Sequence, residues 1–375
     1  MHGLFAMRGR AAPNLMPGVL DTMRLPILAA ALCLFGPAAI LAQPAAPAGG
    51  SMTLLTYSGI FRDNYTPVVV APFTQRTGTA VNYVDTGLGG SAAMLGSLRA
   101  QKADPQVDVV IMDATTAAAA CAEGLVERVN PAEIAPWAEL DDQARAAGNG
   151  CGPAVTYDHL ALVYDSRAVT PAPTRWADLA RPDLKGRVAL STLPNIQALA
   201  LTAILAHSNG GDWKNIGAAL PLLTRIAPNV QTFEPSPDGY SMVLSEQVRA
   251  ATGWNARAQL YRDQSGGRLG VALPEEGTAF QINTINIVTG AKNRAQALAY
   301  VNHALSAEAQ AAFTDRMFYG PVNTRAQGSA AAIGRTALAP EYRSRVLPID
   351  WVEAVRLRDG WNQRWRREVI PAAGR

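Results

Sequence analysis

The sequence predicts an α/β protein of two lobes, in which each lobe is a sheet flanked by helices and crossover strands join the two. Two observations predict this fold class. The chain has 375 residues, and a single hydrophobic core usually stops growing below that size. Apolar strand-like segments also alternate with helix-like segments in both halves, which is the pattern of parallel sheets wound with helices. Hydrophobic residues make up 49% of the chain, so it can bury large cores.

The first 42 residues have the layout of a secretory signal. Arg24 precedes an apolar run at 25–41, which ends in small residues at Ala42. A run of about 17 residues is short for a membrane span and suits a cleaved signal. A Pro/Ala/Gly-rich linker follows at 43–50. The segment therefore predicts export to the periplasm, and a retained membrane anchor is the alternative.

The elements of the first lobe follow the linker in the order β-α-β-α-β-α. A helix should begin at Thr66-Pro67 and end at Gly78, with a kink at Pro72. Thr115 or Thr116 should cap an Ala-rich helix that stops before Gly124. Strands are expected at 52–57, 79–84 and 107–112, and a further helix at 91–103. The third strand is apolar enough to be covered on both faces.

A second unit of the same kind follows a crossover at 157–164, and it is succeeded by a late strand and three helices. We expect lobe 1 at 51–156 plus about 283–330, lobe 2 at 157–282, and a C-terminal helical tail at 331–375. The tail begins with a capping box at 350–353, and it favours a docking helix over one that lies on a membrane surface. Further strands are expected at 188–191, 248–254 and 280–288. Helices are expected from 194 onward and at 216–226, 294–305 and 306–313.

Charge and cysteine usage exclude several classes of function. A formal net charge of +3 leaves no strong basic field for nucleic acid. The three Cys and four His show no zinc-ligand spacing. Removal of the signal would remove Cys33 and leave Cys121 and Cys151 in an oxidising compartment, where a disulfide can persist. Two unpaired buried thiols are the alternative.

The sequence gives no support for catalysis or for a bound cofactor. It contains no Gly-x-Ser-x-Gly nucleophile elbow, and His207 and His303 lie in apolar helices as ordinary structural residues would. The loop at 87–91 offers backbone N–H groups and a Ser at a helix start, but it lacks both nucleotide fingerprints. It is either an anion site or a tight turn with positive φ. We therefore expect a binding protein rather than an enzyme.

Candidate ligand-binding residues follow the strands, because ligands of open α/β sheets bind beyond the carboxyl ends of strands. Tyr57 and Trp254 are candidate stacking walls, although a Trp there is as often core filler. Arg257 stands at a helix start, against the helix dipole, and a guanidinium that recognises an anion would explain its position. A solvated surface Arg is the alternative. The hydrogen-bonding candidates are Ser58, Ser91, Asp113, Thr192 and Asn283.

Several short segments together resemble a known family, the extracytoplasmic solute-binding proteins of ABC importers, in the group that contains spermidine/putrescine-binding and ferric-iron-binding proteins. They span nearly the whole mature chain in order. The segments are LLTYSG at 54–59, FTQRTG at 73–78, VDVV at 107–110, WADL at 176–179, LKGRV at 184–188, GW at 253–254, PEEG at 274–277 and YGPVN at 319–323.

The resemblance implies a periplasmic-binding-protein fold of type II character, with a ligand between the lobes and hinges near 155–157 and 280–283. It also implies an ABC permease with its ATPase as partners, and a monomer. The polyamine-binding members have acids where this chain has Arg257 and Asn283, and the iron-binding members have a Tyr pair that this chain lacks. We therefore expect a small organic solute with an anionic group. Polyamine or ferric iron is the alternative within the family; a secreted α/β enzyme or a sensor subunit is the alternative outside it.

Overall fold

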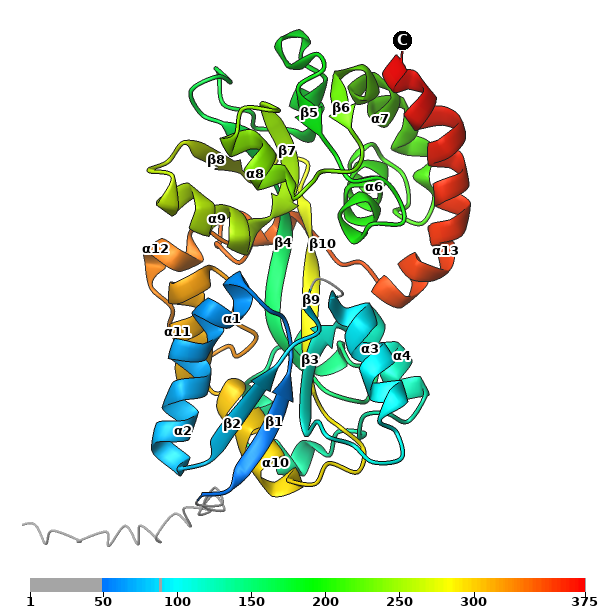
Figure 1. The fold of residues 1–375 in the computed structure, drawn as a ribbon. Coiled ribbons are helices and arrows are strands. Elements are labelled where there is room, and N and C mark those ends of the chain that lie inside the picture. The colour runs from blue at the N-terminus through cyan, green and yellow to red at the C-terminus, as the bar shows by residue number, and fades with distance from the viewer. Residues whose placement is uncertain (1–48, 88–89, 375) are drawn as a thin grey trace, which may run out of the picture. The chain divides into compact units, whose positions relative to one another are not determined.

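One mixed sheet of ten strands runs through the part of the chain that the computed structural model describes, residues 49–87 and 90–374. Its main path runs β2-β1-β3-β9-β4-β7-β5-β6, with β10 beside β9 and β8 beside β4 (Figure 1). The predicted signal segment at 1–42 lies outside the described residues. The strands are β1 Ser51–Leu55, β2 Ala80–Val84, β3 Val109–Asp113, β4 Ala154–Asp165, β5 Val188–Ala189, β6 Val230–Thr232, β7 Ala250–Trp254, β8 Leu269–Ala272, β9 Thr278–Ile287 and β10 Val346–Leu347.

Two long strands connect the two halves of this sheet. The first half of β4, from Ala154 to His159, pairs antiparallel with β9, and its second half pairs with β7 and β8. The end of β9 from Asn283 to Ile287 pairs with β3. This confirms the predicted α/β architecture with crossover strands. The segments predicted as hinges pair with each other, Tyr157 opposite Ile282. Their hinge role and the bounds of the lobes stay predictions.

Each half of the sheet is covered on both faces. In β3, Val109 and Ile111 belong to one hydrophobic cluster, whereas Val110 and Met112 belong to another. In β4, Leu162 and Val163 likewise face separate clusters in the second half. Alternate side chains point to opposite faces of a strand, so the continuous apolar runs are buried on both sides, as predicted.

The helices of the first half confirm most of the predicted elements, with two corrections. The first helix begins at Ile60 rather than Thr66, because α1 continues through a π-helical turn at Thr66–Val70 into α2. Pro72 has no N–H to donate to the turn before it, and the ladder widens there instead of breaking. The helices are α1 Ile60–Tyr65, α2 Ala71–Thr77, α3 Gly90–Ala100, α4 Ala114–Ala122, α5 Asp142–Ala146, α10 Arg294–Ala304, α11 Ala307–Met317 and α12 Ala330–Ile333.

The second correction concerns the start of α4. Its cap is Asp113, whose side chain accepts hydrogen bonds from the N–H groups of Thr115 and Thr116. A carboxylate that ends a buried strand is already placed to cap the next helix, so the two Thr residues fall inside the first turn.

The second half contains four helices of its own, and the tail packs onto the first two of them. Trp361 and Trp365 of the tail lie in the same buried cluster as Trp176, and the Trp365 Nε1 donates to Thr202 at 3.1 Å. The tail is therefore a docking helix, as predicted, and its first helix also contacts α4. The helices are α6 Ile196–Ser208, α7 Leu220–Ile226, α8 Gly239–Leu244, α9 Asn255–Gln264 and α13 Trp351–Arg364, the last followed by helical turns at Trp365–Val369 and Ile370–Gly374.

Cys121, near the end of α4, forms a disulfide with Cys151, with 6.0 Å between their Cα atoms. The bond settles the pairing that the sequence left open. Among the described residues, no helix combines the length and apolar character that crossing a bilayer requires.

Candidate functional site

A chain of hydrogen bonds joins four of the predicted site residues, and we call Tyr57, Ser91, Asp113 and Asn283 the hydroxyl network. The Asp113 N–H donates to Ser91 Oγ at 3.0 Å, and Ser91 Oγ lies 2.8 Å from the Tyr57 hydroxyl. The Tyr57 hydroxyl in turn donates to Asn283 Oδ1 at 2.9 Å. Burial raises the pKa of Tyr57 well above its ordinary value, so its hydroxyl stays neutral and serves as a donor.

The members of this network already have protein partners. Gln281 Nε2 also donates to Asn283 Oδ1 at 2.7 Å, and Asn283 Nδ2 donates to Thr156 Oγ1 at 2.9 Å. Both oxygens of Asp113 accept bonds from the first turn of α4. The network therefore fixes the ends of β1 and β3 relative to the middle of β9, and little of its hydrogen-bonding capacity is left over.

The glycine-rich loop beside the network fits a tight turn. Ser58 Oγ donates to the Gly87 carbonyl at 3.3 Å, and the Gly87 N–H donates to Asp85 Oδ1 at 2.9 Å. Gly87 and Gly90 have φ of 61° and 55°, which glycine adopts without strain. Residues 88 and 89 lie outside the described part, so an anion site in this loop stays a prediction.

Trp254 and Arg257 stand together at the junction of β7 and α9. The Trp254 N–H donates to the Tyr240 hydroxyl, which donates back to the Trp254 carbonyl at 3.0 Å. A Cβ at Gly253 would lie 2.3 Å from the Tyr240 ring, so glycine is required there. Trp254 is half-buried against the core of the second half, and a stacking role for it stays a prediction.

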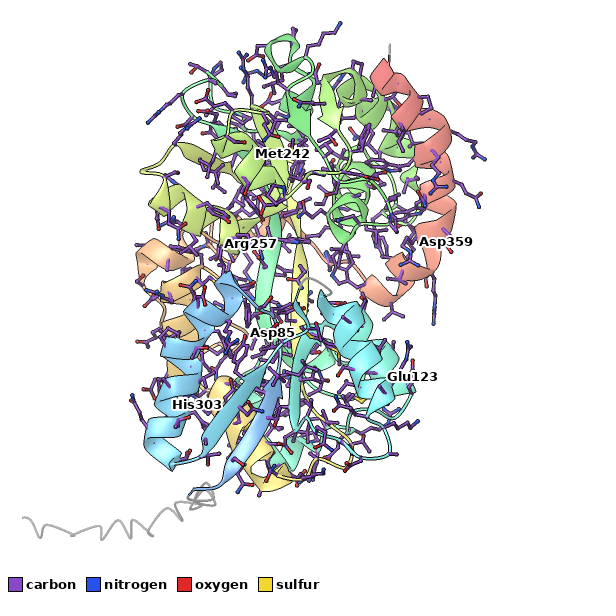
Figure 2. All side chains as sticks on the ribbon, viewed as in Figure 1. Asp85, Glu123, Met242, Arg257, His303 and Asp359 are labelled. Carbon is purple, nitrogen blue, oxygen red and sulfur yellow. A yellow bond between two sulfur atoms is a disulfide. The ribbon has the colours of Figure 1, made fainter. Side chains whose placement is uncertain are left out.

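Arg257, which is labelled in Figure 2, is exposed, and it forms no hydrogen bond or ion pair with another described residue. Desolvation by the surrounding protein lowers the pKa of Arg257. The nearby Tyr240, Tyr319, Asp238 and Tyr261 outweigh that effect and raise the pKa. None of those groups forms an ion pair with it in the described part of the chain. Its guanidinium is therefore free to take an anion in a bidentate arrangement.

Three residues lie near Arg257, and we call Asp158, Arg257, Tyr240 and Tyr319 the charged group. Asp158 is 2% exposed on β4, and its Oδ1 accepts from the N–H groups of Ala256 at 3.0 Å and His159 at 2.8 Å. Burial raises the pKa of Asp158 to about 7, whereas backbone N–H groups and the charge of Arg257 lower it. This carboxyl is buried among the groups that surround Arg257.

Tyr319 connects the charged group to the hydroxyl network. Burial raises its pKa well above the ordinary value, and Asp158, Arg257, Tyr57 and Tyr240 all act on it. Gly320 exchanges backbone hydrogen bonds with Tyr157 at 3.1 and 2.7 Å, which sets Tyr319 beside Asp158. Its ring packs on Phe61, 5.9 Å between centroids, as Tyr57 does at 5.4 Å.

Sequence reasoning missed Asp158 and Tyr319 for different reasons. Asp158 lies inside a strand, whereas ligands of open α/β sheets are expected beyond the strand ends. A lone acid in the apolar run at 154–163 was the available signal. Tyr319 belongs to the YGPVN segment that marked the family, but nothing in that segment indicates its spatial neighbours.

The remaining candidate, Thr192, is joined to neither group by a described hydrogen bond. Its N–H donates to the Phe233 carbonyl at 3.0 Å, and its buried hydroxyl has no partner among the described residues. No group of three metal-ligating side chains occurs in residues 49–87 and 90–374. The groups brought together are therefore one cation without an ion pair, one buried acid, several phenols and the helix-capping carboxylate of Asp238.

Comparisons with known proteins agree with this architecture. The chain is 25% identical over 339 residues to the spermidine/putrescine-binding periplasmic protein of Escherichia coli strain K12, covering 89% of this chain and 92% of that protein. It is 24% identical to a gamma-aminobutyric acid-binding protein of Pseudomonas aeruginosa, covering 84% and 86%.

A solved structure shows the same fold. The chain superposes with a TM-score of 0.72 on a putative extracellular solute-binding protein from Bordetella parapertussis, at 20% identity over 85% of this chain and 98% of that one. The sequence profile of the family described as "Bacterial extracellular solute-binding protein" matches residues 69–340, more than half of the chain. The chain therefore belongs to the bacterial extracellular solute-binding protein family.

Proposed function

We propose that this protein captures a small organic acid in the periplasm and delivers it to an ABC permease of the inner membrane, which its ATPase powers. Family membership and the relatives' names support a transport role and a small-molecule ligand. The apolar segment at 25–41 supports export through a signal peptide. The protein acts as a monomer that closes on its solute by a shift in population between open and closed forms.

The unpartnered guanidinium of Arg257 is the observation that carries the choice of solute. It is exposed, Tyr240 and Tyr319 lie near it, and no described acid forms an ion pair with it. Binding an acid there adds charge-assisted hydrogen bonds without breaking an ion pair of the protein. An ammonium group of a polyamine placed beside Arg257 would be repelled by the guanidinium. This repulsion weighs against polyamines, the ligands named for some relatives, as the solute of this chain.

The hydroxyl network serves as a preformed wall of the proposed site. Tyr57 offers its ring and edge, and Trp254 offers a half-buried indole from the opposite half of the sheet. Aromatic faces of this kind hold the apolar body of a small solute. The proposed role of Ser58, Ser91, Asp113, Thr192 and Asn283 is to complete or support that wall.

A thermal-shift screen tests this proposal. The mature protein, from residue 43, is melted alone and with a panel of small carboxylates, phosphonates, amino acids, putrescine, spermidine and ferric citrate. A ligand at 100 times its Kd stabilises the native state by about 2.7 kcal/mol, so an acid of the right shape should raise Tm by several degrees. Tight binding of spermidine, with no response to any acid, would contradict the proposal. Turnover of a small ester or amide would favour an enzyme instead.

A further inference from the structure

We infer that Asp158 recognises an ammonium group on the solute, so that the ligand is an amino acid or amino phosphonate with its two charges at opposite ends. This inference rests on the proposed function and names the class of solute more narrowly. It starts from a buried carboxyl that no protein cation balances.

The surroundings of Asp158 leave its charge unpaired. It is 2% exposed, and within the described residues no side-chain nitrogen of Lys, Arg or His lies within 4.0 Å of its carboxyl oxygens. The hydrogen bonds it accepts come from the backbone N–H groups of His159 and Ala256. A buried carboxylate of this kind is costly unless a cation pairs with it. A bound ammonium would supply that cation.

The elements packed around Asp158 present few other titratable groups. The start of α9 contributes Arg257, α8 contributes Tyr240, and the segment after α11 contributes Tyr319. His159 follows it on β4, and burial lowers the pKa of that imidazole to about 3, so it is neutral. The group therefore holds one acid and one cation that form no ion pair with each other, with neutral phenols beside them. A second acid, Asp238, also lies near Arg257 and Tyr240; its side chain caps α8, and it forms no ion pair among the described residues.

An arrangement of this kind matches a solute with a charge at each end. Arg257 takes the acid and Asp158 takes the ammonium, while the phenols of Tyr240 and Tyr319 offer hydrogen bonds to either end. The solute would form ion pairs with two charged groups, Arg257 and Asp158, that have no ion pair within the described protein. A simple acid would satisfy Arg257 only, and a diamine would satisfy Asp158 only.

Capping of α9 is the structural alternative for Asp158. Its Oδ1 accepts from Ala256 in the first turn of α9, and Trp254 provides no side-chain cap of its own. An Asn side chain can accept the same bond through its Oδ1. Asp158→Asn therefore removes the charge and keeps the cap, which separates the two roles.

Calorimetric titration with matched ligand pairs tests the inference. The pairs are γ-aminobutyrate with butyrate, and 2-aminoethylphosphonate with ethylphosphonate, which differ only in the amino group. At pH 8 the wild type should prefer an amino member by at least roughly 30-fold, the loss expected when one partner of a buried charge pair is removed. The preference should shrink at pH 5.5, because protonation of Asp158 competes with the ammonium.

Two variants complete the experiment. Asp158→Asn should bind the amino and plain members within a few-fold of each other, and Asp141→Asn, which alters the capping Asp of α5, should behave as wild type. If Asp158→Asn does not fold, the ligand pairs and the pH series on the wild type still decide. Equal binding of butyrate and γ-aminobutyrate by the wild type would overturn this inference and leave the proposed function standing. Binding of none of the panel acids would overturn both.

Discussion

The hydroxyl network and the charged group lie at the same junction of the sheet, yet they differ in what the protein leaves free. In the network, Tyr57, Ser91 and Asn283 donate to and accept from one another, and Asp113 caps a helix. In the charged group, Asp158 and Arg257 carry charges that no described residue pairs. We infer from this difference that the hydroxyl network fixes the geometry of the site, whereas the charged group can still form ion pairs and hydrogen bonds with a solute.

Replacing Arg257 should have the largest effect and tests the charged group directly. Arg257→Gln should cost about 2–5 kcal/mol of binding free energy, at least 30-fold in Kd, for any acid that the wild type binds. The variant should fold normally, because Arg257 has no described hydrogen bond to lose. Titration calorimetry measures the change.

Arg262→Gln is the matched control, since Arg262 is an exposed Arg of the same helix. It should leave Kd within about twofold, as expected for a rim charge. An Arg257→Gln protein with wild-type affinity would place the solute elsewhere and break the comparison.

Removing the disulfide should have the next largest effect, and on stability alone. Cys121 and Cys151 are 30 residues apart, and closing a loop of that length stabilises a fold by about 3–4 kcal/mol. Cys121→Ala/Cys151→Ala should lower the urea midpoint accordingly. The end of α4 is loosened, whereas Asp113 still caps its start, so affinity should persist. Loss of solute binding in a folded double variant would show that the half of the molecule that carries the hydroxyl network contributes directly to binding, and not only to the geometry of the site.

Asn283→Ala sharpens the account of the hydroxyl network. It leaves Tyr57, Gln281 and Thr156 each short of one hydrogen-bond partner, which should cost about 1–3 kcal/mol of unfolding free energy. Affinity should change by less than about fivefold, since only about 1 kcal/mol of positioning is lost.

The neighbouring Asn286 is buried on the same strand and donates within the fold. Asn286→Ala should destabilise the protein to a similar degree with no effect on binding. If Asn283→Ala abolished binding while Asn286→Ala did not, Asn283 would be a ligand-contacting residue and not only a support.

The pH dependence of stability without solute tests whether the charge of Asp158 is balanced in the free protein. The folded pKa of Asp158, about 7, lies above the ordinary value of 3.8, so the native state binds a proton more tightly than the unfolded chain does. The contribution of Asp158 to stability is fully present below pH 3.8 and is lost as pH rises through 7. The free energy of unfolding of the wild type minus that of Asp158→Asn, measured by urea unfolding from pH 4 to 8, should show this loss. A flat difference would mean that the pKa of Asp158 is the same in the folded and unfolded chain, which would contradict an unbalanced buried charge.

Much of the fold could be predicted from the sequence because its signals are local. Alternation of apolar strands with helices, the glycine at position 78 and the Asp350 cap of the tail helix each act within a few residues; of the predicted capping box, the structure describes the bond that Asp350 accepts from the Glu353 N–H. The first helix was misplaced because Pro67 resembles a helix start, whereas its neighbours continue an existing helix through a π-helical turn. The disulfide stayed open because residue spacing does not fix the distance between two cysteines.

The site could be predicted only in part. Positions beyond the expected strands led to Tyr57, Ser91 and Asp113, and the structure joins them to Asn283, another predicted candidate, which lies inside β9. Arg257 stood out because its position opposes a helix dipole. Asp158 and Tyr319 come together through the pairing of β4 with the segment at 319–320, a contact between residues about 160 positions apart that no local pattern encodes.

A crystal structure of the mature protein with the acid that gives the largest thermal shift tests the central claim most directly. We predict that two oxygens of the acid group lie about 2.8 Å from the guanidinium of Arg257, the distance of a charge-assisted bidentate pair. An acid group bound instead at the start of α3, on the N–H groups of Gly90 and Ser91 with Arg257 in solvent, would contradict it.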